Sequence, residues 1–147
     1  MRVLIQRVDK AKVRVEGNVV AEIASGFLLF IGIAKGDDSK DLEYLATKVL
    51  NLRIFPDSQG RMNLNIQQVN GQILSVSQFT LCADTRKGNR PGFDNAAEPD
   101  VAEKLWLEFN QLLKKSGIDT KEGVFGALMD VELTNNGPAT IWLDSRQ

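Results

Sequence analysis

The chain of 147 residues contains no histidine and only one cysteine, Cys82. Without an imidazole, the Ser-His-Asp and Cys-His mechanisms and the His-ligated metal sites are excluded. A single thiol cannot form an internal disulfide and leaves none of the usual zinc ligand sets. If the chain is an enzyme, its acid-base chemistry falls to carboxylates, backbone dipoles, water or the substrate, and we expect no cofactor or metal.

Long apolar runs and an excess of positive charge are also lacking. The longest apolar segment, Phe27–Ala34, is far shorter than the roughly 20 residues of a membrane-spanning helix. Met1–Arg7 contains no apolar stretch of signal-peptide length. Lys and Arg total 18 against 19 for Asp and Glu, so any contact with nucleic acid must come from a local patch. We expect a soluble cytoplasmic protein that binds neither membranes nor DNA.

The residue patterns predict one α+β domain over residues 1–147. Strand-like runs flank a hairpin turn at Glu16–Asn18, and Asn70-Gly71 is a second hairpin signal. Other strands are predicted over 27–33, 72–77, 131–133 and 140–143, and a loop over 84–95. Two helices among about seven strands, without regular βαβ alternation, predict a mostly antiparallel, barrel-like sheet.

Each predicted helix has a recognisable start and a single apolar face. The first follows the turn and cap residues Gly36–Ser39, and the second runs from Pro99 to Gly117. The inward-facing residues are predicted to be Leu42, Leu45, Val49 and Leu50 in the first helix and Val101, Leu105, Phe109, Leu112 and Leu113 in the second.

Two short segments offer chemistry. Ser77–Leu81, at a predicted strand end, contains two hydroxyls, an amide and an aromatic ring, and such groups could stabilise a carbonyl oxygen as negative charge develops. Asn136–Thr140 contains Gly137-Pro138, a step that a tight turn can hold in the cis form. From spacing alone, the commoner interpretations are a polar strand edge and a hairpin loop.

Together these segments resemble the two signature motifs of the D-aminoacyl-tRNA deacylase family, and the likeness extends over roughly residues 1–145. It also includes Met1–Val8, Asn51–Phe55 with Asp57 and Gly60, Ala83-Asp84, Lys87-Gly88, Arg90-Pro91 and Phe125–Met129. One departure is Ala139, where the family usually has valine after Gly-Pro.

The resemblance implies an enzyme that hydrolyses the ester bond of D-aminoacyl-tRNA, and of some glycyl-tRNA, as a proofreading step in translation. It implies the DTD-like fold and a homodimer in which a cis Gly137-Pro138 step enters the partner's pocket. There the main chain leaves no room for an L-side chain. Arg7 resembles the residue that tethers this loop in the family.

The family also suggests a role for each remaining site residue. Ser77, Gln78, Phe79 and Thr80 would line the aminoacyl pocket, and Phe125, Gly126, Ala127 and Met129 would hold the terminal adenosine. Because the Thr80 hydroxyl has no histidine base, we favour a mechanism in which the tRNA's own 2′-hydroxyl activates or positions water. Backbone amides near Phe79 and Thr80 would then stabilise the oxyanion.

Other residues and functions leave alternatives open. Arg86, Lys87 and Arg90 form either a solvated loop or a contact with acceptor-stem phosphates. Trp106 is interpreted as helix packing, and Cys82 as a small buried apolar residue. A non-catalytic module that binds the tRNA 3′ end, or an L-specific editing domain like those fused to some archaeal threonyl-tRNA synthetases, are the alternative functions.

Overall fold

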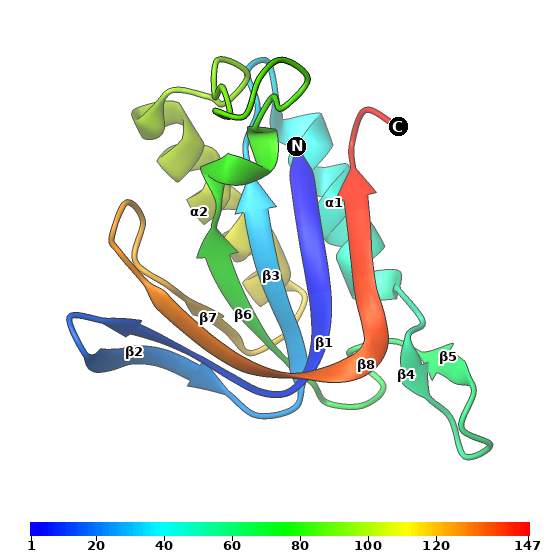
Figure 1. Cartoon of the computed structure of the whole chain (residues 1–147). Coiled ribbons are helices and arrows are strands. Elements are labelled where there is room, and N and C mark those ends of the chain that lie inside the picture. The colour runs from blue at the N-terminus through cyan, green and yellow to red at the C-terminus, as the bar shows by residue number, and fades with distance from the viewer.

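In a computed structural model that describes residues 1–147, a curled sheet packs against two helices and a small hairpin projects from it (Figure 1). The sheet has the order β2-β1-β3-β6-β7, and β8 pairs with β1 as well. The strands are β1 (Arg2–Val15), β2 (Asn18–Ile23), β3 (Gly26–Gly32), β6 (Gln72–Ser77), β7 (Thr120–Glu122) and β8 (Asp130–Asp144). The separate hairpin consists of β4 (Phe55–Pro56) and β5 (Met62–Leu64).

The β1–β2 hairpin forms at the predicted turn. Glu16 and Gly17 have φ values of 50° and 78°, as a two-residue type I′ turn requires, and this turn matches the right-handed twist of the strands it joins. The first half of β1 lies between β3 and β8, and its second half lies between β2 and β8. This long strand therefore joins the two parts of the curled sheet.

The sheet is mixed, and the predicted hairpin at Asn70-Gly71 is wrong. Asn70 ends a turn that leads into β6, which pairs in parallel with both β3 and β7. Residues 33–71 form a long crossover that returns the chain to the starting end of β3, so the next strand is parallel. β3 is the predicted strand with both faces buried.

The helices are α1 (Ser39–Asn51) and α2 (Pro99–Lys115). Asp38 caps α1 in a capping box with Asp41, and α2 begins at Pro99, as predicted. The prediction that Val101 faces inward is wrong, because its side chain is 50% exposed. Phe109 and Leu113 are buried, as predicted, Leu105 and Leu112 are partly buried, and Ala102, Trp106 and Asn110 complete the buried face of α2.

β8 is one strand of 15 residues, not two short strands around a hairpin loop. Its register shows why a proline fits: Gln6 pairs with Thr140 and Val8 with Asn135, so residues 136–139 bulge outward opposite the single residue Arg7. A bulge frees the backbone from the ladder, so the N–H that proline lacks is not needed there.

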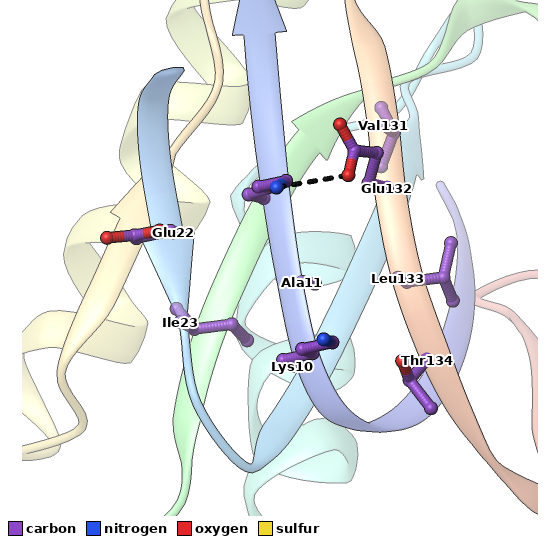
Figure 2. A pocket seen from close by; sticks show the side chains of 9 residues that line it. Lys10, Ala11, Glu22, Ile23, Val131, Glu132, Leu133 and Thr134 are labelled. Atoms are coloured by element: carbon purple, nitrogen blue, oxygen red, sulfur yellow. Dashed lines mark ion pairs between the residues drawn. The ribbon is translucent and has the colours of Figure 1, made fainter.

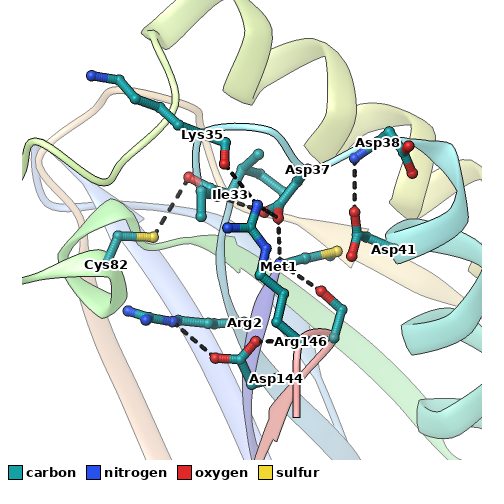
Figure 3. Close-up of polar contacts among 12 residues, drawn as sticks. Met1, Arg2, Ile33, Lys35, Asp37, Asp38, Asp41, Cys82, Asp144 and Arg146 are labelled. Carbon is teal, nitrogen blue, oxygen red and sulfur yellow. Dashed lines mark hydrogen bonds and ion pairs between the residues drawn. The ribbon is translucent and has the colours of Figure 1, made fainter.

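Ion pairs join the two ends of the chain to the start of α1 (Figure 3). The Met1 ammonium lies 2.6 Å from Asp37 and 2.8 Å from the Ser145 hydroxyl. Asp37 also accepts hydrogen bonds from Arg146 at 2.8 Å and from the Ala34 amide at 2.6 Å. These contacts hold β1, β8 and the β3–α1 connection together. Neither helix is long and apolar enough to cross a membrane.

Candidate functional site

The first predicted motif lies at the carboxyl end of β6, where the chain turns into a single 3₁₀ turn, η1 (Phe79–Cys82). The backbone N–H of Gln78 donates to the Ile31 carbonyl at 2.7 Å. Gly32 permits this close approach, because a Cβ there would lie 3.0 Å from the Leu81 Cβ. Phe79 and Thr80 begin the turn, so their N–H groups have no acceptor within it.

The Thr80 hydroxyl has no base beside it. Its partner is the Gln78 side-chain amide, whose Nε2 donates to Thr80 Oγ1. An amide N–H cannot accept a proton, so this contact orients the hydroxyl but does not activate it. Cys82 is fully buried, and burial raises the pKa of its thiol, as expected for a small core residue. The structure contains no cluster of three acidic or cysteine side chains that could hold a metal.

A cavity of about 540 Å³ opens beside this turn. It brings both predicted pocket segments together: Ser77, Gln78 and Phe79 on one side, and Phe125, Gly126, Ala127 and Met129 on the other. Thr80 lies beside the cavity, exposed, and is not among its lining residues. Sequence reasoning missed Trp106 as a lining residue, because a tryptophan on the apolar face of a helix normally only packs in the core.

The loop 123–129 is held against the sheet at Gly123. The Gly123 amide donates to the Ser75 carbonyl at 2.9 Å, and a Cβ at Gly123 would lie 2.8 Å from the Met129 sulfur. Leu128 is 95% exposed at the rim. The Phe79 ring, 57% exposed, contacts the edge of Phe93 with ring centres 5.0 Å apart. The cavity therefore has an apolar interior and an aromatic rim.

Gly137-Pro138 is a cis step, as the resemblance implies, and it is exposed within the β8 bulge. Arg7, only 7% exposed, donates to the Asn136 carbonyl at 3.1 Å, the Asn136 side chain at 2.9 Å and the Gly137 carbonyl at 3.4 Å. It also donates to the Ile54 carbonyl. The Asn135 side chain bridges the carbonyls of Arg7 and Ala139 at 3.0 and 3.2 Å. The bulge is thus fixed from both ends.

The bulge and the cavity of the same subunit lie far apart. The strand registers place Arg7 level with Phe27 and Ile73, whereas the motif begins at Ser77. Three strand spacings and about four residues along the strands separate the two, or roughly 19 Å for ideal geometry. Gly137-Pro138 therefore cannot line the cavity of its own subunit.

The predicted basic loop is closed at its base by paired hydrogen bonds between Asp84 and Gly92, of 2.8 and 2.9 Å. Within it, Arg86 forms a fork with the Asp84 carboxylate at 2.9 and 2.6 Å. This contact holds the pKa of Asp84 well below its usual range. Lys87 and Arg90 form no ion pair. They line a polar cavity of about 530 Å³. Its other lining residues include Gly92 and Asp94, the two sequence neighbours of Phe93.

A third cavity, of about 560 Å³, lies over β1, β2 and β8 and contains none of the predicted site residues (Figure 2). Two of its four charged side chains are paired with each other: Glu132 lies 3.1 Å from Lys12 and also accepts from Arg14 at 2.7 Å, whereas Lys10 and Glu22 form no ion pair. The Arg14 hydrogen bond is the main reason that the pKa of Glu132 is lowered. The cavity is therefore an exposed sheet face with mixed charges, apart from the predicted site.

Comparisons with known proteins agree with these features. The protein family described as D-Tyr-tRNA(Tyr) deacylase matches residues 4–144. A D-aminoacyl-tRNA deacylase of Thermodesulfovibrio yellowstonii is 53% identical over 99% of this chain and 100% of its own length. One of Bacillus velezensis is 50% identical over 100% of both chains.

Two solved structures share the fold. A protein named c-Myc DNA Unwinding Element Binding Protein superposes with a TM-score of 0.92 at 38% identity, covering 98% of both chains. A probable eukaryotic D-amino acid tRNA deacylase superposes with a TM-score of 0.82 at 19% identity, covering 97% of both chains. The likeness confirms the predicted α+β, barrel-like fold.

Proposed function

The chain belongs to the D-Tyr-tRNA(Tyr) deacylase family, and from this we propose that it hydrolyses the ester bond of D-aminoacyl-tRNA in the cytoplasm, releasing the free D-amino acid and tRNA. It is therefore an enzyme of the hydrolase class. The observation on which this rests is the cavity at the end of β6, where Ser77–Phe79 and Phe125–Met129 meet although 45 residues or more separate them in sequence.

The cavity has the two parts that such a substrate needs. Its apolar half, with Phe125 and Met129, suits the terminal adenosine of tRNA. Its polar half, with Ser77 and Gln78, suits the aminoacyl ester next to it. The mostly apolar lining with a few convergent polar groups is typical of a small-molecule site.

Chemistry in this site depends on placement more than on a protein base. The attacking water adds to the ester carbon, and the N–H groups of Phe79 and Thr80 stabilise the negative charge that develops on the carbonyl oxygen. The 2′-hydroxyl of the terminal ribose positions the water or accepts its proton. Thr80 stays uncoupled from any base, because its hydroxyl partner is the Gln78 amide. The bond between the carbonyl carbon and the 3′-oxygen then breaks, and the proton that the water gives up passes through the 2′-hydroxyl to the 3′-oxygen, which leaves as a hydroxyl.

Chiral selection comes from a second subunit in this proposal. Gly137-Pro138 is exposed, held by Arg7, and too distant to reach the cavity of its own chain. In a homodimer, the bulge of one subunit closes the cavity of the other. A main-chain wall rejects any L-side chain by collision but admits glycine and D-residues without contacting their side chains. Broad acceptance of D-amino acids follows.

The basic loop would bind the phosphates that precede the terminal adenosine. Lys87 and Arg90 are its unpaired cations, whereas Arg86 is already engaged by Asp84. We therefore expect Lys87→Gln and Arg90→Gln each to lower tRNA affinity and to reduce the salt slope by about one. Arg86→Gln should change both much less, and it is the matched control within the same loop.

Parallel deacylation of D-tyrosyl-tRNA and L-tyrosyl-tRNA tests the proposal directly. We expect rapid loss of the D-ester and survival of the L-ester. Equal lifetimes of both esters with and without protein would eliminate the enzyme. Tight tRNA binding without hydrolysis would instead support a 3′-end binding module, and loss of the L-ester alone would support an L-specific editing domain. Duplex DNA as a competitor tests whether the chain also binds DNA.

Subunit mixing tests the cross-subunit wall. An Arg7→Met homodimer should hydrolyse L-tyrosyl-tRNA because its wall is loose. Excess subunits that carry Phe79→Ala, with an impaired pocket but an intact wall, should form heterodimers and suppress that L-activity while D-activity persists. Sedimentation should show dimers throughout. If subunits exchange but mixing leaves the hydrolysis of L-tyrosyl-tRNA unchanged, the bulge does not close the pocket of the partner subunit.

A further inference from the structure

The inner wall of the cavity at the end of β6 is an indole ring from α2. Trp106 is only 3% exposed, yet it lines the cavity together with Ala102 from the preceding turn of the helix. Its Nε1 donates to the Ser75 hydroxyl at 2.9 Å, and Ser75 is fully buried on β6. A buried indole N–H needs such a partner, so this bond fixes the plane of the ring.

Ser75 holds both walls of this cavity. Its hydroxyl accepts from Trp106 of α2, and its backbone carbonyl accepts from the Gly123 amide at 2.9 Å, where the loop 123–129 begins. That loop supplies Phe125, whose ring centre lies 5.9 Å from that of Trp106, with the ring planes tilted by 41°. The two rings form an aromatic corner whose shape depends on one buried serine.

We propose that Trp106, locked by Ser75, is a specificity-determining residue that selects a purine nucleobase in this cavity. The assignment rests on the proposed function, because the base would be that of the terminal adenosine. Because the two ring planes are tilted by 41°, a flat base that stacks on Phe125 meets the indole at the inner wall with its edge. The longer ring system of a purine reaches that wall and contacts more of the corner than a pyrimidine does. Ser75 is a positioning residue, because it acts through the indole.

Intrinsic fluorescence provides the first test, because the chain has only two tryptophans, Trp106 and Trp142. In a Trp142→Phe protein the cavity indole is the sole reporter, and 5′-AMP should change its emission saturably. With 5′-CMP, which has the same charge, we expect an apparent affinity about tenfold weaker, a loss comparable to that of one good base contact. The matched control is Trp106→Phe, which leaves only Trp142 on β8, outside the cavity, and its emission should not saturate.

A double-mutant cycle provides the second test. Ser75→Ala should raise KM for D-aminoacyl-tRNA by about three- to tenfold, the value of one net hydrogen bond, with kcat unchanged. In the Trp106→Phe background, where the indole N–H is gone, Ser75→Ala should have no further effect on KM. Thermal unfolding confirms that each variant is folded at the assay temperature.

The outcomes separate this inference from the proposed function. If D-esters are hydrolysed but 5′-AMP leaves Trp106 emission unchanged, the inference is wrong and the function stands. If no ester is hydrolysed but 5′-AMP still binds at Trp106 in preference to 5′-CMP, the purine site stands and the function fails. Two other results would overturn the inference about Trp106: equal changes in emission with 5′-AMP and 5′-CMP, or the same increase in KM from Ser75→Ala in the wild-type and Trp106→Phe backgrounds.

Discussion

Replacing Arg7 with lysine should relax the rejection of L-amino acids without stopping catalysis. The guanidinium holds the β8 bulge through two good hydrogen bonds to Asn136, of 3.1 and 2.9 Å, and a longer one of 3.4 Å to the Gly137 carbonyl. It also reaches the Ile54 carbonyl on the opposite side. Lysine keeps the charge but lacks the planar fork, so it cannot satisfy acceptors on both sides.

The size of the effect follows from those contacts. If lysine keeps the hydrogen bond to the buried Ile54 carbonyl, the bulge loses its two ordinary hydrogen bonds, which contribute about 1 kcal/mol each. The loop can then move aside for about 2 kcal/mol less, and at about 1.4 kcal/mol per tenfold this corresponds to a roughly 30-fold faster hydrolysis of L-tyrosyl-tRNA. Hydrolysis of D-tyrosyl-tRNA should change by less than about threefold, because no D-side chain touches the wall.

Parallel deacylation assays with both esters measure this change, and thermal unfolding confirms that the variant is folded. Arg14→Lys is the matched control: Arg14 lies on the same strand, but its partner is Glu132, away from the bulge. It should leave both rates unchanged. If Arg7→Lys is folded and still leaves the L-ester intact, either the bulge is not the chiral wall or Arg7 does not hold it.

Three further predictions concern Thr80, Gly26 and Asp57. Thr80→Ala should keep kcat within about tenfold of the wild type, whereas loss of a true nucleophile costs on the order of 10⁴-fold or more, and single-turnover deacylation distinguishes the two. Gly26→Ala should destabilise the fold by about 3 kcal/mol or more, because the new Cβ would lie 1.8 Å from the Gln72 carbonyl oxygen of the neighbouring strand; Gly92→Ala, where the nearest atom is 3.9 Å away, should be nearly neutral in denaturant unfolding. Hydrogen bonds from the backbone N–H groups of Arg61 and then Gln59 lower the pKa of Asp57, so its carboxylate stabilises the fold above about pH 4 and this contribution disappears as the pH falls further. Asp57→Asn should therefore lower Tm near neutral pH but not in acid, and a difference in Tm that stays constant with pH would contradict this.

Local sequence signals determined much of the fold and of the site. Glu16-Gly17 specified the β1–β2 turn, and Asp38 specified the start of α1, because turns and caps depend on neighbours in the chain. The family likeness indicated the SQFTL segment Ser77–Leu81 and the Phe125–Met129 loop as parts of one pocket, and the structure brings them together.

Tertiary structure alone decided the rest. Whether Asn70-Gly71 begins a hairpin depends on which strand lies beside β6, and the long crossover through α1 made that pairing parallel. Val101 and Ala102 both fit an amphipathic pattern, and only packing against the sheet selected the face that contains Ala102 and Trp106. The distance between Gly137-Pro138 and the cavity likewise follows from strand register. The parallel pairing of β6, the buried face of α2 and the position of the bulge all depend on contacts between segments that are distant in the chain. A local pattern specifies the periodicity of an element but not its neighbours.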